Sequence, residues 1–326
     1  MIELGLSVAD LAATRFALSP LWEVTASIRV LKSPAEHTLH RRWAKAAGPR
    51  LRGRDLRLLF DLVPVPTRGL PAFLAPPPST STPDLALELA AMRTTGHDEV
   101  RAGLGMIPRT PAIEDFAADL DAGLPRLETA IADYWEAALA PWWPRIRALC
   151  ERDLLYRSRL LAEGGAKRLF ADLHPQIRWD PSGTLRIDNR QWEIAEALGG
   201  RGLLLVPTVF GGERIFSVVA QPWTPTVRYP PRGLATLWSG EAPAAPAALD
   251  GVLGPTRAAL LAALAEPAST TSLAERTGLS AGAVSQQLGL LHRAGLVSRH
   301  RTGRLVLYAR TLTAEALLEA PESAAP

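Results

Sequence analysis

The chain has 326 residues, of which 47% are hydrophobic, so it is long enough for two or three domains with sizeable cores and is not a wholly disordered protein. Its 36 Lys and Arg residues nearly balance its 33 Asp and Glu residues, and the net charge of +3 does not by itself indicate a partner. The single cysteine, Cys150, excludes a disulfide framework, a zinc site built from several cysteines and an iron–sulfur cluster. No signal-peptide pattern and no uncharged apolar run of about 18 residues is present, so we expect a cytoplasmic protein that does not enter a membrane.

The first 60 residues predict a short strand followed by helices, one of which begins at Ser19-Pro20. Residues 29–57 carry nine basic residues and only two acids. This bias is typical of a solvated helical face, although it would also suit a surface that contacts DNA or a partner.

Seven prolines between residues 64 and 83 predict a loop, because proline fits neither a helix interior nor a central strand. Helical patterns return from 84 to about 172. Pro141 and Pro144 are expected to break the long helix of this region.

The periodicity changes between residues 176 and 230. Thr184–Asp188 alternates with period two, as a half-buried strand does, and Leu203–Phe210 is a nearly continuous apolar run. We therefore predict an α+β protein whose N-terminal region, residues 1–238, has helices over 1–172 and a small antiparallel sheet over 176–230.

Residues 239–254 are rich in Ala, Pro and Gly and predict a linker. A separate C-terminal domain is then expected over residues 255–326. We expect the N-terminal region, residues 1–238, to dimerise, to sense an effector, or both.

The C-terminal domain has the pattern of a helix-turn-helix. Pro255 suits the first turn of a helix, and Ser272–Glu275 resembles a capping box at the start of a second helix. Gly278 is expected to end that helix in a left-handed conformation, and Ser280 to cap a third helix. Three helices with a tight turn between the last two define this motif.

The third helix, about residues 281–294, has two different faces. Val284, Leu288 and Leu291 are spaced to point inward. The opposite face has no acid and no large apolar residue, and it carries Gly282, Ser285, Gln286, Gly289 and Arg293. Such a face is typical of a recognition helix, because Gln and Ser can hydrogen-bond to base edges in the major groove.

A hairpin follows Gly295, with strands at 296–301 and 304–308 around Thr302-Gly303. From Arg276 to Ala314 there are six arginines and no acid. This charge distribution predicts a wing that lies along phosphates or enters the minor groove.

We therefore predict a winged helix-turn-helix that binds double-stranded operator DNA through nine residues. Ser280, Ser285, Gln286 and Gln287 are expected near bases, and Arg293, Arg299, Arg301, Thr302 and Arg304 at phosphates or in the minor groove.

The stretch Leu279–Val297, followed by Arg301–Arg304, resembles the ArsR-type winged helix-turn-helix regulators. The shared pattern is the recognition helix, the sequence Ala-Gly-Leu-Val and a Gly-Arg wing. This resemblance implies a homodimeric repressor that releases DNA when an effector binds. The chain departs from the pattern at Gln287, where His is common, and at Gly289, where a basic residue is common. Its second helix lacks the cysteines of metal-sensing members, so the effector is not expected to be a metal bound by thiolates.

Residues 7–23 are also similar to the start of a group of actinobacterial ArsR-like regulators with a long N-terminal region of unassigned role. This second resemblance implies no ligand.

Other candidate sites are weaker. His37 and His40 could share a metal but lack a clear third ligand, so we expect a surface pair and no metal. Gly199–Gly202 precedes a strand instead of following one, which argues against a dinucleotide or phosphate loop. The nine tryptophans all lie between Trp22 and Trp238, where they would form the core or line an effector pocket.

We expect no catalytic residue and no cofactor. The expected partners are operator DNA, a second copy of the chain and a small-molecule effector, without a membrane. Two alternatives stay open, in which an enzyme or a protein-interaction module uses the winged helix for dimerisation or for binding another protein.

Overall fold

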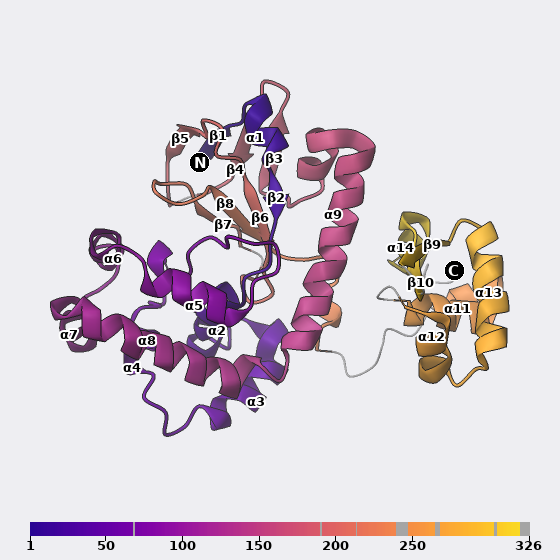
Figure 1. Ribbon diagram of the computed structural model, residues 1–326, viewed down its shortest axis with the longest axis horizontal. Coiled ribbons are helices and arrows are strands. Elements are labelled where there is room, and N and C mark those ends of the chain that lie inside the picture. The colour runs from indigo at the N-terminus through magenta and orange to yellow at the C-terminus, as the bar shows by residue number, and fades with distance from the viewer. Residues whose placement is uncertain are drawn as a thin grey trace. The chain divides into compact units, whose positions relative to one another are not determined.

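The computed structural model describes residues 1–319 except Arg68, Arg190, Glu213, 239–246, 265–267, Gly303 and Arg304, and for some residues, including Arg301 and Thr302, it describes only the backbone. The fold is α+β and divides into two compact units, Met1–Trp238 and Ser239–Pro326 (Figure 1).

The N-terminal unit begins with a short strand, a short helix and a second strand: β1 (Ile2–Gly5), α1 (Val8–Ala12) and β2 (Arg15–Phe16). A block of helices follows, which consists of α2 (Pro20–Lys32), α3 (Arg41–Arg50), α4 (Arg57–Asp61), α5 (Leu85–Arg93), α6 (His97–Leu104), α7 (Pro111–Ala118) and α8 (Leu120–Tyr134). Short helical turns lie at η1 (Thr38–His40), η2 (Ala72–Leu74) and η3 (Trp135–Leu139, a π-helix).

Helix α2 is the central helix of this block. Ser19 caps it through a hydrogen bond from the Trp22 amide, and Pro20 occupies its first turn. Every residue from Pro20 to Val30 is buried, so α2 is packed on all sides. The buried carboxylate of Glu88 on α5 accepts hydrogen bonds from the Ser19 hydroxyl at 2.6 Å and the Leu21 amide at 2.8 Å.

Helix α9 (Trp143–Ala171) follows the break predicted at Pro141 and Pro144. Its first part packs into the helical core, and its end, with Leu169 and Phe170, packs against residues of the two sheets. Figure 1 shows α9 running alongside the strands. Gly165 interrupts the helix with φ 63° and ψ −163°, a conformation that glycine adopts readily.

The prediction of one small antiparallel sheet over 176–230 is wrong. The strands β3 (Ile177–Asp180), β4 (Thr184–Ile187), β5 (Ile194–Ala197), β6 (Leu204–Pro207), β7 (Phe216–Val218) and β8 (Thr226–Tyr229) belong to two mixed sheets. One sheet has the order β3-β4-β1-β5 and the other the order β2-β6-β8-β7.

Each sheet recruits a strand from the N-terminus. β1 pairs antiparallel with β4 and parallel with β5, so that Ile2 lies opposite both Ile187 and Ile194. β2 pairs parallel with β6. Parallel partners need a long crossover, and the whole helical block provides it here. The two sheets share one hydrophobic cluster, which includes Leu4 and Leu205.

The predicted surface pair of histidines is also wrong for His40, which is only 1% exposed. Its Nδ1 accepts a hydrogen bond from Trp238 Nε1 at 3.0 Å, and its ring packs against Phe210. The Trp238 carbonyl accepts a further hydrogen bond from Arg42. A short turn, η4 (Leu234–Thr236), precedes this anchored residue.

The C-terminal unit contains α10 (Ala247–Leu253), α11 (Pro255–Ala263), α12 (Thr270–Thr277), α13 (Ala281–Arg293), β9 (Val297–Thr302), β10 (Leu305–Arg310) and α14 (Leu312–Glu319). Part of the range predicted as a linker, 239–254, is therefore helical, because 247–253 form α10, which packs against α11.

Candidate nucleic-acid interface

Helices α12 and α13 form the helix-turn-helix. The cap of α12 is Ser269, whose hydroxyl accepts the Ser272 amide at 3.2 Å. The helix thus begins one turn earlier than the capping-box pattern at Ser272 predicts, because Ser269 offers the same cap three residues upstream.

The turn between the two helices has the predicted conformations. Gly278 ends α12 with φ 70°, in the left-handed region that favours glycine. Ser280 begins α13, and its hydroxyl accepts the Ala283 amide at 3.2 Å. Gly295 ends the following segment with φ 71°.

The inward face of α13 joins the core of the unit. Val284, Leu288 and Leu291 are at most 2% exposed, and they belong to one hydrophobic cluster with Leu261 and Leu273. This packing fixes the rotation of α13 about its axis. The opposite face is therefore held toward solvent.

That outer face presents small and hydrogen-bonding residues. Ser285 and Gln286 are exposed, whereas Gln287 is half-buried. Space for a methyl group is open at Gly282, and at Gly289 the nearest atom is Arg293 Nη1, at 3.7 Å. The Gln286 side chain thus stands between two glycines. The expectation of a face without large apolar residues is wrong at its border, because Leu290, one turn after Gln286, is 37% exposed.

The wing has a regular antiparallel register, with Thr302 opposite Leu305 and Arg299 opposite Tyr308. The Ala268 and Tyr308 backbones exchange two hydrogen bonds of 2.9 Å, which extends the hairpin on its other side. The sequence gives little sign of this bridge, because a single residue forms it.

Among the arginines of this segment whose side chains the structure describes, Arg276 and Arg310 have hydrogen-bond partners within the domain. Arg310 donates to the carbonyls of Leu261 and Ala262 at 2.6 and 2.5 Å, and Arg276 donates to Ala263 at 3.2 Å. These contacts satisfy free carbonyls at the end of α11. Charge counting alone could not separate these two arginines from those predicted to contact DNA.

The predicted DNA-contacting residues fall into three groups. The first group lies on α13 or caps its start and consists of Ser280, Ser285, Gln286, Gln287 and Arg293. The second is Arg299, which is exposed on β9. The third consists of residues whose side chains the structure does not describe. Arg301 and Thr302 belong to β9, with undescribed side chains, and Arg304 lies outside the described residues.

A comparison with protein families finds a helix-turn-helix domain at residues 253–300. No curated protein and no solved structure shows a significant match to the chain. The match covers α11, α12, α13 and the start of β9. It therefore includes α13, the helix that carries the outer face described above. The chain thus carries a helix-turn-helix domain of the DNA-binding regulator class.

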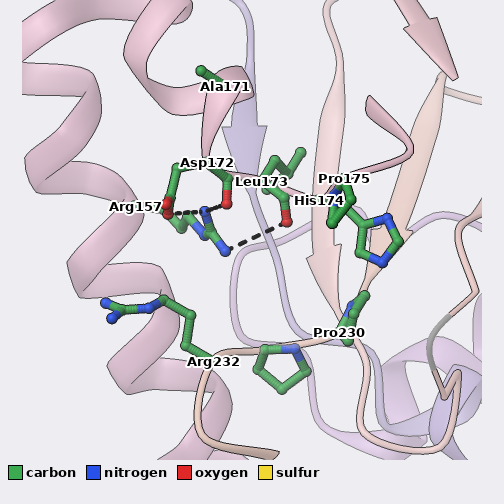
Figure 2. A pocket seen from close by; sticks show the side chains of 9 residues that line it. Arg157, Ala171, Asp172, Leu173, His174, Pro175, Pro230 and Arg232 are labelled. Carbon is green, nitrogen blue, oxygen red and sulfur yellow. Dashed lines mark hydrogen bonds and ion pairs between the residues drawn. The ribbon is translucent and has the colours of Figure 1, made fainter. Parts of the chain in front are cut away.

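The N-terminal unit has a surface hollow of about 370 Å³ beside the end of α9 (Figure 2). Its wall includes Arg157, which is buried but already engaged: it donates to the Asp172 carboxylate at 2.7 Å and forms an ion pair with Asp153. Figure 2 shows the guanidinium turned toward Asp172 and Leu173. We interpret Arg157 as a structural residue, which connects the middle of α9 to Asp172 and Leu173 just after the end of this helix.

Among the described residues, no group of three or more His, Cys, Asp or Glu side chains could hold a metal ion. In the same part of the chain, no helix has the length and hydropathy needed to cross a membrane.

Proposed function

We propose that the protein is a transcriptional regulator of the ArsR type, a homodimeric repressor that leaves its operator when a small molecule binds. The observation that carries this proposal is the outer face of α13, where Ser285 and Gln286 are exposed between glycines on a helix without acids. A recognition helix needs such a face, because it must approach base edges closely and without charge repulsion.

The residue roles follow from position. Ser280, Ser285, Gln286 and Gln287 would meet bases, with Gln286 offering two hydrogen bonds to adenine. Arg293, Arg299, Arg301, Thr302 and Arg304 would hold phosphates or enter the minor groove. In a homodimer the two α13 helices would occupy major grooves about one helical turn apart.

The effector in this proposal is not a thiolate-bound metal. The single cysteine, Cys150, is 2% exposed, and burial raises the pKa of its thiol well above the ordinary value. A thiol that stays protonated and enclosed is a poor metal ligand.

A gel-shift titration with DNA from upstream of the gene tests the proposal. Wild-type protein should bind this DNA in preference to a shuffled duplex, and Gln286→Ala should lose about 1–3 kcal/mol of that preference. Arg299→Ala should weaken binding to both duplexes and lower the salt slope by about one.

Ala259, exposed on α11, offers a matched control, since Ala259→Ser should leave both affinities unchanged. Equal affinity for the two duplexes would rule out sequence reading by α13. Binding to neither duplex would instead favour a module that contacts another protein.

A further inference from the structure

We propose that Arg29, together with Thr67 and Phe216, forms a binding site for the carboxylate of a small organic acid with an apolar body. Only its role as the effector site rests on the proposed function. The binding itself is a property of the N-terminal unit.

Three arginines of this unit are almost completely buried: Arg29, Arg157 and Arg228 are 4%, 2% and 1% exposed. Arg157 forms ion pairs with Asp153 and Asp172. The opposite charge of the buried Glu88 favours the charged form of Arg228, and Arg228 donates a hydrogen bond to the Ala75 carbonyl at 2.9 Å. Arg228, like Arg29, forms no ion pair with a residue that the structure describes, and both Arg157 and Arg228 leave one buried nitrogen, Nε, without a hydrogen-bond partner. Arg29 differs from both in the acid that acts on its charge, because Glu36 is exposed whereas Asp153 and Glu88 are buried.

The bonding of Arg29 is incomplete. Its Nε donates to the Thr67 hydroxyl at 3.0 Å, whereas its Nη1 is buried and has no hydrogen-bond partner. The guanidinium lies over the Phe216 ring at 4.8 Å from the centroid. A buried charge with an unused donor carries a large desolvation cost, which an anion would offset.

The surrounding charges favour an anion over a cation. Burial and, to a smaller extent, the nearby charge of Arg214 lower the pKa of Arg29 to about 10, so the guanidinium stays charged at neutral pH. Burial and the charges of Arg29 and Arg214 also lower the pKa of His37. Among the residues that the structure describes, the acid that acts on the charge of Arg29 is Glu36, which is exposed and forms no ion pair with Arg29.

The apolar body has a surface to lie on. Phe216 and the rest of β7 are half-buried, and Trp22 packs edge-on against Phe216 at 5.1 Å. Two residues beyond Thr67, a methyl group at Gly69 would lie 3.2 Å from Met106 and 3.5 Å from Trp192. Met106 and Trp192 are 50% and 43% exposed. Charge and apolar surface thus adjoin along one loop.

The site is also connected to the end of the unit. Phe216 begins β7, and the segment that leads from β6 into this strand contains Phe210, whose ring packs against Trp238 at 6.0 Å. Trp238 is the last residue of the N-terminal unit. A ligand that moved this segment would act directly on the residue from which the chain leaves toward the helix-turn-helix.

The test measures the thermal stability of the full chain with benzoate as the probe and benzamide, its neutral analogue, as the control. Benzoate at about 20 mM should raise the Tm in a concentration-dependent way, and benzamide should not. Arg29→Met should weaken the benzoate response at least about tenfold. Its own Tm without ligand should not fall below the wild-type value, because the variant removes an unpaired buried charge.

Arg214→Ala provides a second variant on the surface, with little risk to folding. It should weaken the benzoate response several-fold, most at low salt, whereas Arg109→Ala, the loss of another exposed arginine, should not. The proposal is overturned if benzoate does not stabilise the wild type, if benzamide does so equally, or if both Arg29→Met and Arg214→Ala keep the full response.

A gel shift with and without benzoate separates the two proposals. Loss of DNA binding upon addition of benzoate supports both. Benzoate binding that depends on Arg29, in a protein that binds no DNA, supports the site and refutes the regulator.

Discussion

Ser280 is expected to have two roles, as the cap of α13 and as a contact to DNA. Its hydroxyl accepts the Ala283 amide at 3.2 Å, so Ser280→Ala leaves one amide of the first turn without a partner. The loss of such a cap costs about 1 kcal/mol. Amides in the first turn of α13 should then exchange with deuterium about fivefold faster, because local opening becomes that much easier.

Hydrogen exchange followed by mass spectrometry of peptides that cover residues 281–293 measures this change. Ser280→Asn restores the cap and should restore the wild-type exchange rate. If it does so without restoring affinity for DNA, Ser280 also touches the nucleic acid. Unchanged exchange in Ser280→Ala would refute the reasoning, since the cap would then contribute nothing to the helix.

Two further predictions concern polar groups that make hydrogen bonds inside the protein. Arg310→Ala should lower the free energy of unfolding of the C-terminal unit by about 1–3 kcal/mol, because the Leu261 and Ala262 carbonyls lose a charged donor; Arg299→Ala should change it by less than about 0.5 kcal/mol in the same urea titration. Burial raises the pKa of Glu88 to about 7, so the folded state holds a proton that the unfolded state releases above its own pKa of 4.5. The contribution of this proton to the free energy of unfolding is complete below pH 4.5 and is lost as the pH rises through about 7. Glu88→Gln should therefore show a weaker decline in stability over this interval than the wild type, and equal slopes would contradict the assignment.

The helix-turn-helix could be predicted closely because its signals are local. Gly278 and Ser280 determine the turn through their own backbone and hydroxyl, and Val284, Leu288 and Leu291 determine the inward face through spacing alone. The error at α12 is of the same local kind, since Ser269 and Ser272 offer equivalent caps.

The sheets could not be predicted in this way. β1 pairs with β4 and β5, whose residues lie about 180 to 190 positions further along the chain, and no periodicity within a strand identifies such a partner. His40 illustrates the same limit: its burial depends on Phe210 and Trp238, which only the folded chain brings to it. Arg29 likewise resembles any other basic residue of its helix until its burial is known.

The pairing of β1 also has a consequence for the synthesis of the protein. β1 leaves the ribosome long before β4 and β5, yet it lies between these two strands in its sheet. At roughly 5–20 residues per second, its partners emerge about 10 to 40 s later. During this interval the helical block can form while both edges of β1 remain without their strands, so β1 reaches its final position only after β4 and β5 have been made.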